Sequence, residues 1–76
     1  MKELLNYIIQ SLVDEPDAVV INEKTRDSET VFEVRVAEGD MGMVIGRQGR
    51  IVKEIRAIMR AYAQRQGKKV SVEILD

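Results

Sequence analysis

The chain has 76 residues, with 12 basic and 13 acidic side chains, and contains neither cysteine nor histidine. Disulfides and cysteine or histidine metal sites are therefore excluded, and so is histidine as a general base. A chain this short has few residues with which to enclose a pocket. We therefore expect a binding protein rather than an enzyme, with no cofactor.

The first segment is predicted to be a helix. Apolar residues recur at helical spacing between Leu4 and Val13, and the acidic, proline-containing turn of residues 14–17 should end it. The acids of that turn could suggest a metal site, but such a turn usually only stops a helix. No signal-peptide cleavage site is visible, and no apolar run approaches the roughly 20 residues that a membrane span needs. We expect a soluble cytoplasmic protein with no membrane partner.

Two strands should follow as a hairpin. Residues 18–24 contain a β-branched run, and residues 30–37 alternate, with Phe32 and Val34 on the apolar face. Residues 25–28 between them have turn composition. Because the alternating strand has one polar face, helices should cover only one side of the sheet.

The second half should contain two helices and a strand. Asp40 is in position to cap a short helix over residues 41–45. The segment Arg50–Gln66 has the clearest helical periodicity in the chain, and Gly67 should end it. Residues 69–75 alternate again and should form the last strand. The prediction is an α+β fold of element order α-β-β-α-α-β, with a three-stranded mixed sheet.

The formal net charge of −1 hides a separation of charge along the chain. Residues 1–45 carry four basic residues against ten acidic ones, whereas residues 46–69 carry eight basic residues against Glu54 alone. A local basic surface can guide a phosphate chain even on a weakly acidic protein. Nucleic acid therefore remains a candidate ligand.

The basic segment begins at the turn Gly46–Gly49, whose sequence is GRQG. Glycine permits backbone conformations closed to other residues and removes side chains that would hold a ligand away. The following helix N-terminus adds partial positive charge, and Arg47 and Arg50 add full charges. The stretch lacks the features of a P-loop or a dinucleotide fingerprint. The plain alternative is a helix-ending turn without a ligand, but the flanking arginines favour phosphate contact.

Residues beside the turn could extend a binding surface. At about 100° per residue, Lys53, Arg56 and Arg60 fall on one side of the long helix. Apolar candidates for base contact at the rim are Met43, Val44, Ile45 and Val52. A solvated helix face and core-filling methionines are the alternatives.

Other residues of the chain have simpler interpretations. Lys68 and Lys69 indicate a helix end and solvating charge rather than a site. We expect Phe32 and Tyr62 to be buried, so few aromatic side chains are available to stack on bases. Recognition would then depend on aliphatic contacts and backbone amides.

The stretch VIGRQGRIVKEIR resembles the signature of K-homology (KH) domains, in which an I-G-x-x-G turn clamps about four nucleotides of single strand. The element order is similar to the type II arrangement of that fold. From LLNYIIQSLVDEPDAV to KKVSVEI, the pattern resembles the small bacterial single-KH proteins of the KhpA family. Residues 1–76 would then form a single KH domain.

The resemblance assigns roles to residues of the turn. Gly46 and Gly49 would be the clamp glycines, and Arg47 and Gln48 the variable pair facing the phosphates. The predicted RNA-binding residues are therefore Met43, Val44, Ile45, Gly46, Arg47, Gln48, Gly49, Arg50, Lys53 and Arg56.

The resemblance also implies a cellular role. It suggests a single-stranded RNA-binding protein, acting as an RNA chaperone or post-transcriptional regulator with a KhpB-type KH partner, in cell-envelope and cell-length control. A homodimer and a KhpB heterodimer are both compatible with this prediction. The alternative hypothesis is a protein–protein dimerisation module with weak or no RNA binding of its own. The residues alone do not decide between RNA and single-stranded DNA.

Overall fold

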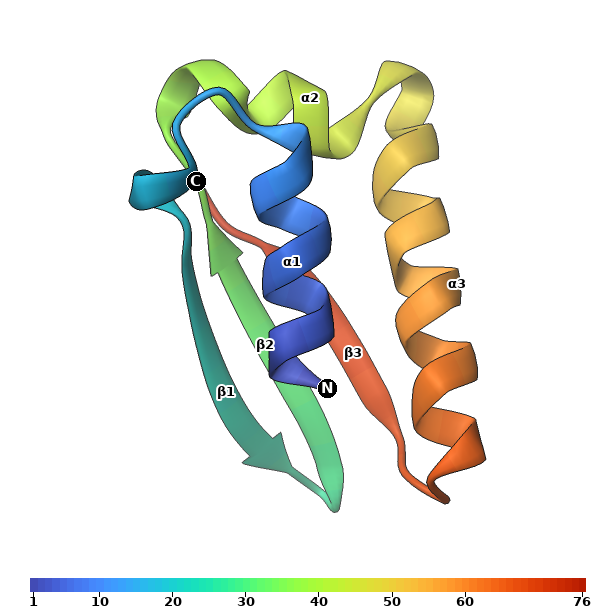
Figure 1. Cartoon of the computed structure of the whole chain (residues 1–76). Helices are drawn as coiled ribbons and strands as arrows, with labels where there is room; N and C mark the ends of the chain where they lie inside the picture. The colour runs from blue at the N-terminus through green and yellow to red at the C-terminus, as the bar shows by residue number, and fades with distance from the viewer.

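The computed structural model describes all 76 residues as a three-stranded sheet with helices on one side (Figure 1). The helices and strands are α1 (Lys2–Leu12), β1 (Val20–Arg26), β2 (Glu29–Arg35), α2 (Met41–Ile45), α3 (Arg50–Arg65) and β3 (Val70–Ile74). Short 3₁₀ turns lie at Pro16–Ala18, Glu38–Asp40 and Arg47–Gly49. The predicted α+β class and element order are confirmed.

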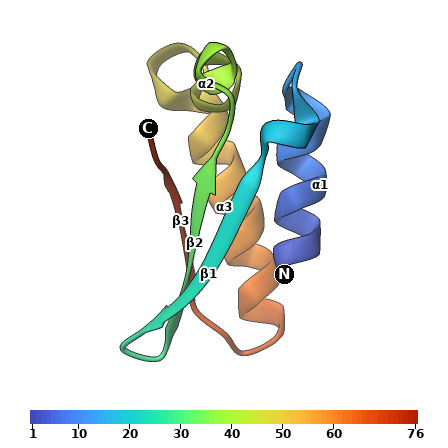
Figure 2. The same cartoon turned by 90° about the vertical axis from the view of Figure 1, so that its left-hand side faces the viewer.

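The sheet is mixed, with strand order β1-β2-β3. β1 pairs antiparallel with β2, and β3 pairs parallel with β2. The parallel pair forms because α2 and α3 carry the chain back along the sheet before β3 begins. α1 and α3 pack against the same face of the sheet, and α2 lies above the upper ends of the strands (Figure 2). One face of the sheet is thereby left without helices, as predicted.

The hairpin turn is tighter than the predicted four residues. Only Asp27 and Ser28 lie outside the strands, and both have positive φ, at 51° and 65°. Two central residues of this kind give a type I′ turn, whose twist matches that of the flanking strands. Both strands therefore reach closer to the turn than expected, and β1 begins only at Val20, after a 3₁₀ turn at Pro16–Ala18.

The core lies between the sheet and the helices. Its buried members are Leu5, Ile9, Ile21, Phe32, Val34, Val44, Ile55, Met59 and Val72. Phe32 is fully buried on the central strand, as expected. The expected burial of Tyr62 is wrong, because its side chain lies at the flank of the apolar stripe of α3 and is 39% exposed.

Asp40 has a different role from the predicted helix cap. It stands at the N-cap position of α2, but its side chain makes no capping hydrogen bond there. Instead, its Oδ2 accepts the amide of Glu15 at 3.0 Å, and the residue is buried. A buried carboxylate needs such a donor, and the bond fixes the α1–β1 connection against the start of α2. The acids of residues 14–17 form no cluster that could hold a metal ion.

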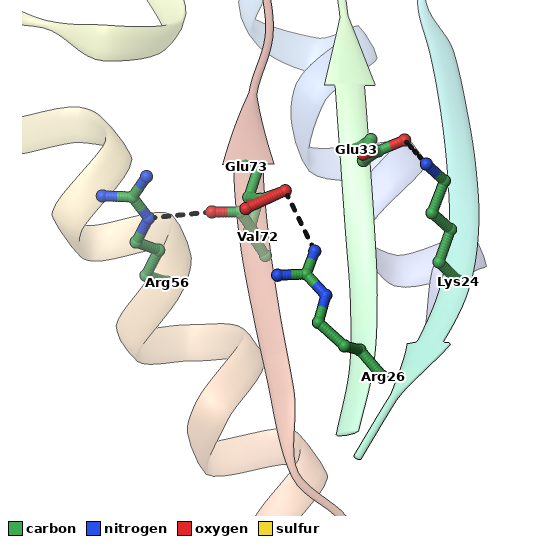
Figure 3. Close-up of polar contacts among 6 residues, drawn as sticks. All are labelled: Lys24, Arg26, Glu33, Arg56, Val72 and Glu73. Atoms are coloured by element: carbon green, nitrogen blue, oxygen red, sulfur yellow. Dashed lines mark hydrogen bonds and ion pairs between the residues drawn. The ribbon is translucent and has the colours of Figure 1, made fainter. Parts of the chain in front are cut away.

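The helix-free side of the sheet, which we call the open face, carries paired charges (Figure 3). Lys24 of β1 pairs with Glu33 of β2 at 3.2 Å, and Arg26 of β1 pairs with Glu73 of β3 at 3.8 Å. The second pair joins the two outer strands, so the Arg26 side chain passes over β2. Val31 lies on this face and is nonetheless buried, which agrees with cover from long side chains of this kind.

None of the helices is both long and apolar enough to cross a membrane.

Candidate nucleic-acid interface

The turn between α2 and α3 is built from left-handed backbone angles. Gly46, Gln48 and Gly49 have φ of 76°, 56° and 74°. The amide of Gly46 donates to the carbonyl of Gly42 at 2.8 Å and ends α2, and the amide of Gly49 donates to the carbonyl of Gly46 at 3.2 Å. The result is a tight turn over Arg47–Gly49, with Gln48 outside helical angles, that leads directly into α3.

The two glycines of the turn are required for different reasons. A Cβ at Gly46 would overlap the Ile51 side chain and lie 2.9 Å from the Ile51 backbone nitrogen. Gly46 is therefore required by the packing of the protein itself. At Gly49 the nearest atom to such a Cβ is Cγ1 of Val52, at 3.9 Å. Of the two, only Gly49 has open space where its Cβ would be.

Arg47 and Gln48 form the exposed tip of the turn. Neither side chain makes a hydrogen bond or ion pair within the protein. Gln48 also has a left-handed conformation, which costs a non-glycine residue about 1–2 kcal/mol. Such strain concentrates at functional sites.

The start of α3 faces the same turn. Gly49 occupies its N-cap position, and no side chain caps the helix there. α3 is 16 residues long, so its N-terminus carries the partial positive charge of a full helix dipole. The amide of Arg50 donates to the carbonyl of Arg47, so an anion at this helix end would be held by the amides that follow it.

Basic side chains continue from the turn along α3. We call Arg47, Arg50, Lys53, Arg56 and Arg60 the basic edge; all five residues are exposed. The two ion pairs of the protein lie elsewhere, on the open face. The cations of the basic edge therefore have no acidic partner and remain available to an anionic ligand.

Arg56 differs from its neighbours because it is held in place. Its Nε donates to the carbonyl of Val72 at 3.0 Å, which ties α3 to β3 (Figure 3). The rest of its guanidinium makes no other hydrogen bond within the protein. Arg56 is therefore a structural tether that still presents donors beside the sheet edge.

The apolar rim is smaller than predicted. Met43 is 41% exposed, and Ile45 is half-buried, so both remain candidates for base contact. Val44 is fully buried in the core and Val52 is nearly so. Because so little of either side chain is exposed, the expectation that they contact bases is wrong.

Sequence reasoning missed a hollow of about 150 Å³ between α3 and β3. Its lining residues are Arg56, Arg60, Val70, Ser71 and Val72. β3 is an edge strand, and the backbone groups of its odd-numbered residues point to β2. The carbonyl of Lys69 accepts the amide of Thr30, and the amide of Leu75 donates to the carbonyl of Val34. By alternation, the backbone groups of Val70, Val72 and Ile74 point outward. The hollow thus combines cations with backbone donors and acceptors.

A mixed sheet with helices on one face, and a glycine turn joining two of those helices beside a free sheet edge, define a KH-type nucleic-acid-binding fold. Comparison with protein families agrees with this class and identifies the family. The chain belongs to the KhpA/KhpB family, whose KH-domain model matches residues 2–74. The resemblance noted in the sequence is confirmed.

Known relatives cover the whole chain. The RNA-binding protein KhpA of Clostridium acetobutylicum is 49% identical over 99% of this chain and 100% of its own length. The protein of the same name from Chlamydia trachomatis is 42% identical over 100% of this chain and 97% of its length. Among solved structures, Aquifex aeolicus Era bound to GDP and AlF4⁻ is similar over 95% of this chain, with a TM-score of 0.60 and 27% identity. This chain spans only 28% of that Era chain.

Proposed function

We propose that this protein binds single-stranded RNA by holding the phosphate backbone at the Gly46–Gly49 turn. The observation that carries the proposal is a combination of three features at one place. The surface at Gly49 is free, the N-terminus of α3 is uncapped, and the basic edge has no acidic partners. Together they supply close approach, backbone donors and charge.

The bound strand would run from the turn along the basic edge. Arg47 and Arg50 would contact the first phosphates, and Lys53 and Arg56 the next. Bases would turn toward Met43, Ile45 and the outward backbone groups of β3, where amides and carbonyls can read base edges. Since a KH unit grips about four nucleotides, we expect micromolar or weaker affinity that falls with salt.

RNA rather than DNA is proposed on the strength of the family, since its relatives are named RNA-binding proteins. Discrimination would require contacts to the 2′-hydroxyl. We further propose a non-enzymatic, cytoplasmic role in RNA folding or post-transcriptional control. A KhpB-type protein is the proposed partner, supported by the shared family model, and cell-envelope growth and cell length are the processes affected.

The test is fluorescence anisotropy of a labelled short single-stranded RNA with wild type and with Arg47→Asp/Gln48→Asp. Arg65→Asp/Gln66→Asp is a matched control, because the same dipeptide is changed in the same way at the far end of α3. Circular dichroism should first confirm that all three proteins fold. We expect the turn variant to lose at least tenfold in affinity, and the control to lose less than about twofold.

Equal loss in both variants would mean that only net charge matters, and the turn would lose its proposed role. Equal retention would place RNA elsewhere on the protein. Absence of binding by wild type would overturn autonomous RNA binding and favour the second candidate.

The second candidate is a protein-contact module. Ile58 and Tyr62 lie one helical turn apart on α3, and their side chains are 49% and 39% exposed. Both exposed fractions are large for apolar side chains. At about 100° per residue they lie on the opposite flank of α3 from Arg56 and Arg60. A second copy or a KhpB-type protein could cover this flank while leaving the basic edge free, so the two functions are compatible.

Equilibrium sedimentation at tens of micromolar tests this candidate with wild type and Ile58→Ser/Tyr62→Ser. Self-association that disappears in the variant supports a contact on this flank. A strict monomer in wild type would remove the homodimer and leave only a foreign partner.

A further inference from the structure

The free edge of β3 offers a base both donors and acceptors. The amides and carbonyls of Val70 and Val72 point away from β2, and both residues line the hollow beside α3. A base at such an edge can pair with the amide and the carbonyl of one residue, as a neighbouring antiparallel strand does. Adenine suits a free pair of this kind, because its N6 amino group can donate while a neighbouring ring nitrogen accepts.

At Val72 the carbonyl of this pair is already occupied. Arg56 Nε donates to it at 3.0 Å, in a part-buried hydrogen bond (Figure 3). Among the outward backbone groups of β3, it is the only one that a side chain holds. The oxygen has a second lone pair, but an amino group that approached it would meet a cationic donor in place. The position beside Val72 therefore disfavours a base that must donate.

The same hydrogen bond restricts the rest of the Arg56 side chain. A guanidinium group is planar and rigid, so holding Nε also limits where the two Nη groups can lie. Neither Nη group makes a hydrogen bond or an ion pair within the protein. They form a fork of donors near the outward amide of Val72. Because the protein has already ordered this fork, a ligand pays less to engage it.

Arg60 shows that lining the hollow is not enough for such a role. It lies about one helical turn further along α3 and lines the same hollow, but it makes no hydrogen bond with β3. Its long side chain can follow a phosphate but has no fixed orientation towards a base. Of the two arginines in the hollow, only Arg56 has the geometry to distinguish one base from another.

We propose that Arg56 sets the base preference of the bound strand at the position beside Val72. Its fork of Nη donors matches a base with two neighbouring acceptors. Guanine presents O6 and N7 in this way and cytosine presents O2 and N3, whereas adenine and uracil have no such pair. The inference rests on the proposed RNA binding at the turn and adds which bases that RNA prefers. It also moves Arg56 from phosphate contact to base contact.

The test compares two purines in an otherwise unchanged RNA. Labelled oligouridines of about six nucleotides carry guanosine or adenosine at every third position. Anisotropy gives the ratio of guanosine to adenosine affinity for wild type, Arg56→Lys and the control Arg65→Lys, after circular dichroism has confirmed that all three fold. Both substitutions keep the charge and remove the fork, but Arg65 is the last residue of α3 and lies outside the hollow.

We expect wild type and Arg65→Lys to prefer the guanosine RNA by about three- to tenfold. In Arg56→Lys the preference should fall below about twofold, because an ammonium group cannot donate to O6 and N7 as a fork. A ratio of two affinities is used because a uniform loss of phosphate binding cancels from it.

A second measurement changes the RNA instead of the protein, so it does not depend on the folding of a variant. The guanosine is replaced by inosine, which keeps O6 and N7, or by 7-deazaguanosine, which lacks N7. With wild type, inosine should bind within about twofold of guanosine, and 7-deazaguanosine within about twofold of adenosine.

A guanosine preference that survives Arg56→Lys overturns the inference, and so does 7-deazaguanosine that binds as tightly as guanosine. Equal binding of guanosine and adenosine by wild type, or a preference for adenosine, also overturns it. Each of these results leaves RNA binding at the turn intact. Failure of wild type to bind any of the RNAs overturns the proposed function and this inference together.

Discussion

The open face of the sheet and the basic edge of α3 both carry arginine and lysine, but only the basic edge leaves these charges free. On the open face, Lys24 and Arg26 pair with glutamates, and Arg35 donates to the backbone carbonyl of Asp76 at 2.8 Å. On the basic edge no acid lies within ion-pair distance. Two surfaces that both carry arginine and lysine therefore differ in what they offer a polyanion.

The difference shows why net charge is a poor guide for this protein. The net charge of −1 is a sum over two different regions. In the sheet the cations pair with acidic side chains, whereas on α3 they do not. Only unpaired cations release counterions from RNA without first losing a partner. The predictions below test whether the contrast depends on the turn, on the free charges or on the paired ones.

The largest expected effect is loss of the turn itself in Gly46→Ala. The new Cβ would meet the Ile51 side chain and backbone, and φ 76° with ψ 174° is a region essentially restricted to glycine. We expect unfolding free energy to fall by about 3 kcal/mol and Tm by about 12–24 °C. Thermal melts followed by circular dichroism measure this. Gly42→Ala is the matched control, because a Cβ there meets nothing within 4 Å, and its Tm should stay within a few degrees. Similar melts for the two variants would disprove the account of Gly46.

Gly49→Ala should separate stability from binding. The backbone is left-handed at φ 74°, but no atom crowds the new methyl group, so the cost should be only about 1 kcal/mol. The methyl group would, however, stand between the turn and a phosphate. RNA affinity should therefore fall about tenfold in a protein that remains folded, as anisotropy and a melt together can show. Unchanged affinity would mean that RNA does not approach this glycine.

How far the sequence predicted these features depends on the kind of contact involved. Periodicity located the helices and the parallel return strand, because burial of one face repeats along each element. It missed the exact hairpin, since type I′ geometry at Asp27 and Ser28 lacks the usual glycine signal. It also assigned Asp40 to its neighbouring helix, whereas the acceptor serves Glu15, 25 positions away in sequence. Such long-range partners leave no local pattern.

The candidate site likewise contains features that a local sequence pattern predicts and features that it does not. The glycine turn and basic residues are visible as a motif, and Arg47, Gln48 and Arg50 lie where the motif predicts, exposed at or beside the turn. Val44 could not be told from a rim residue, because a five-residue helix is too short for periodicity to fix its buried side. The hollow beside β3 depends on which backbone groups of an edge strand point outward, which only pairing with β2 determines.

Removing one free charge should weaken binding without unfolding the protein. We expect Arg50→Ala to lower RNA affinity about three- to tenfold at low salt and to reduce the salt slope by about 0.7. Arg26→Ala, which removes a paired arginine from the open face, should change affinity by less than about twofold. Anisotropy titrations at several salt concentrations compare them. If both variants lose equally, the two surfaces do not differ as proposed.

Arg56→Lys should reveal the tether between α3 and β3. Lysine keeps the charge but lacks the Nε donor that reaches Val72, so about 1 kcal/mol of stability should be lost, or about 4–8 °C in Tm. Faster amide hydrogen exchange in β3 would localise the effect. If the melt and the exchange both match wild type, the hydrogen bond contributes nothing in solution.

The smallest effect is expected for the paired charges of the open face. The Arg26–Glu73 pair has an N···O distance of 3.8 Å, and its side chains are 61% and 42% exposed. Solvent screening should limit its coupling to about 0.5 kcal/mol or less. A double-mutant cycle of Arg26→Ala and Glu73→Ala, followed by denaturant unfolding, measures that coupling.

Glu73→Ala also frees Arg26 without changing the basic edge. If RNA affinity then rises more than about twofold, pairing rather than position keeps the open face from binding, and the strand can use both sides of the molecule.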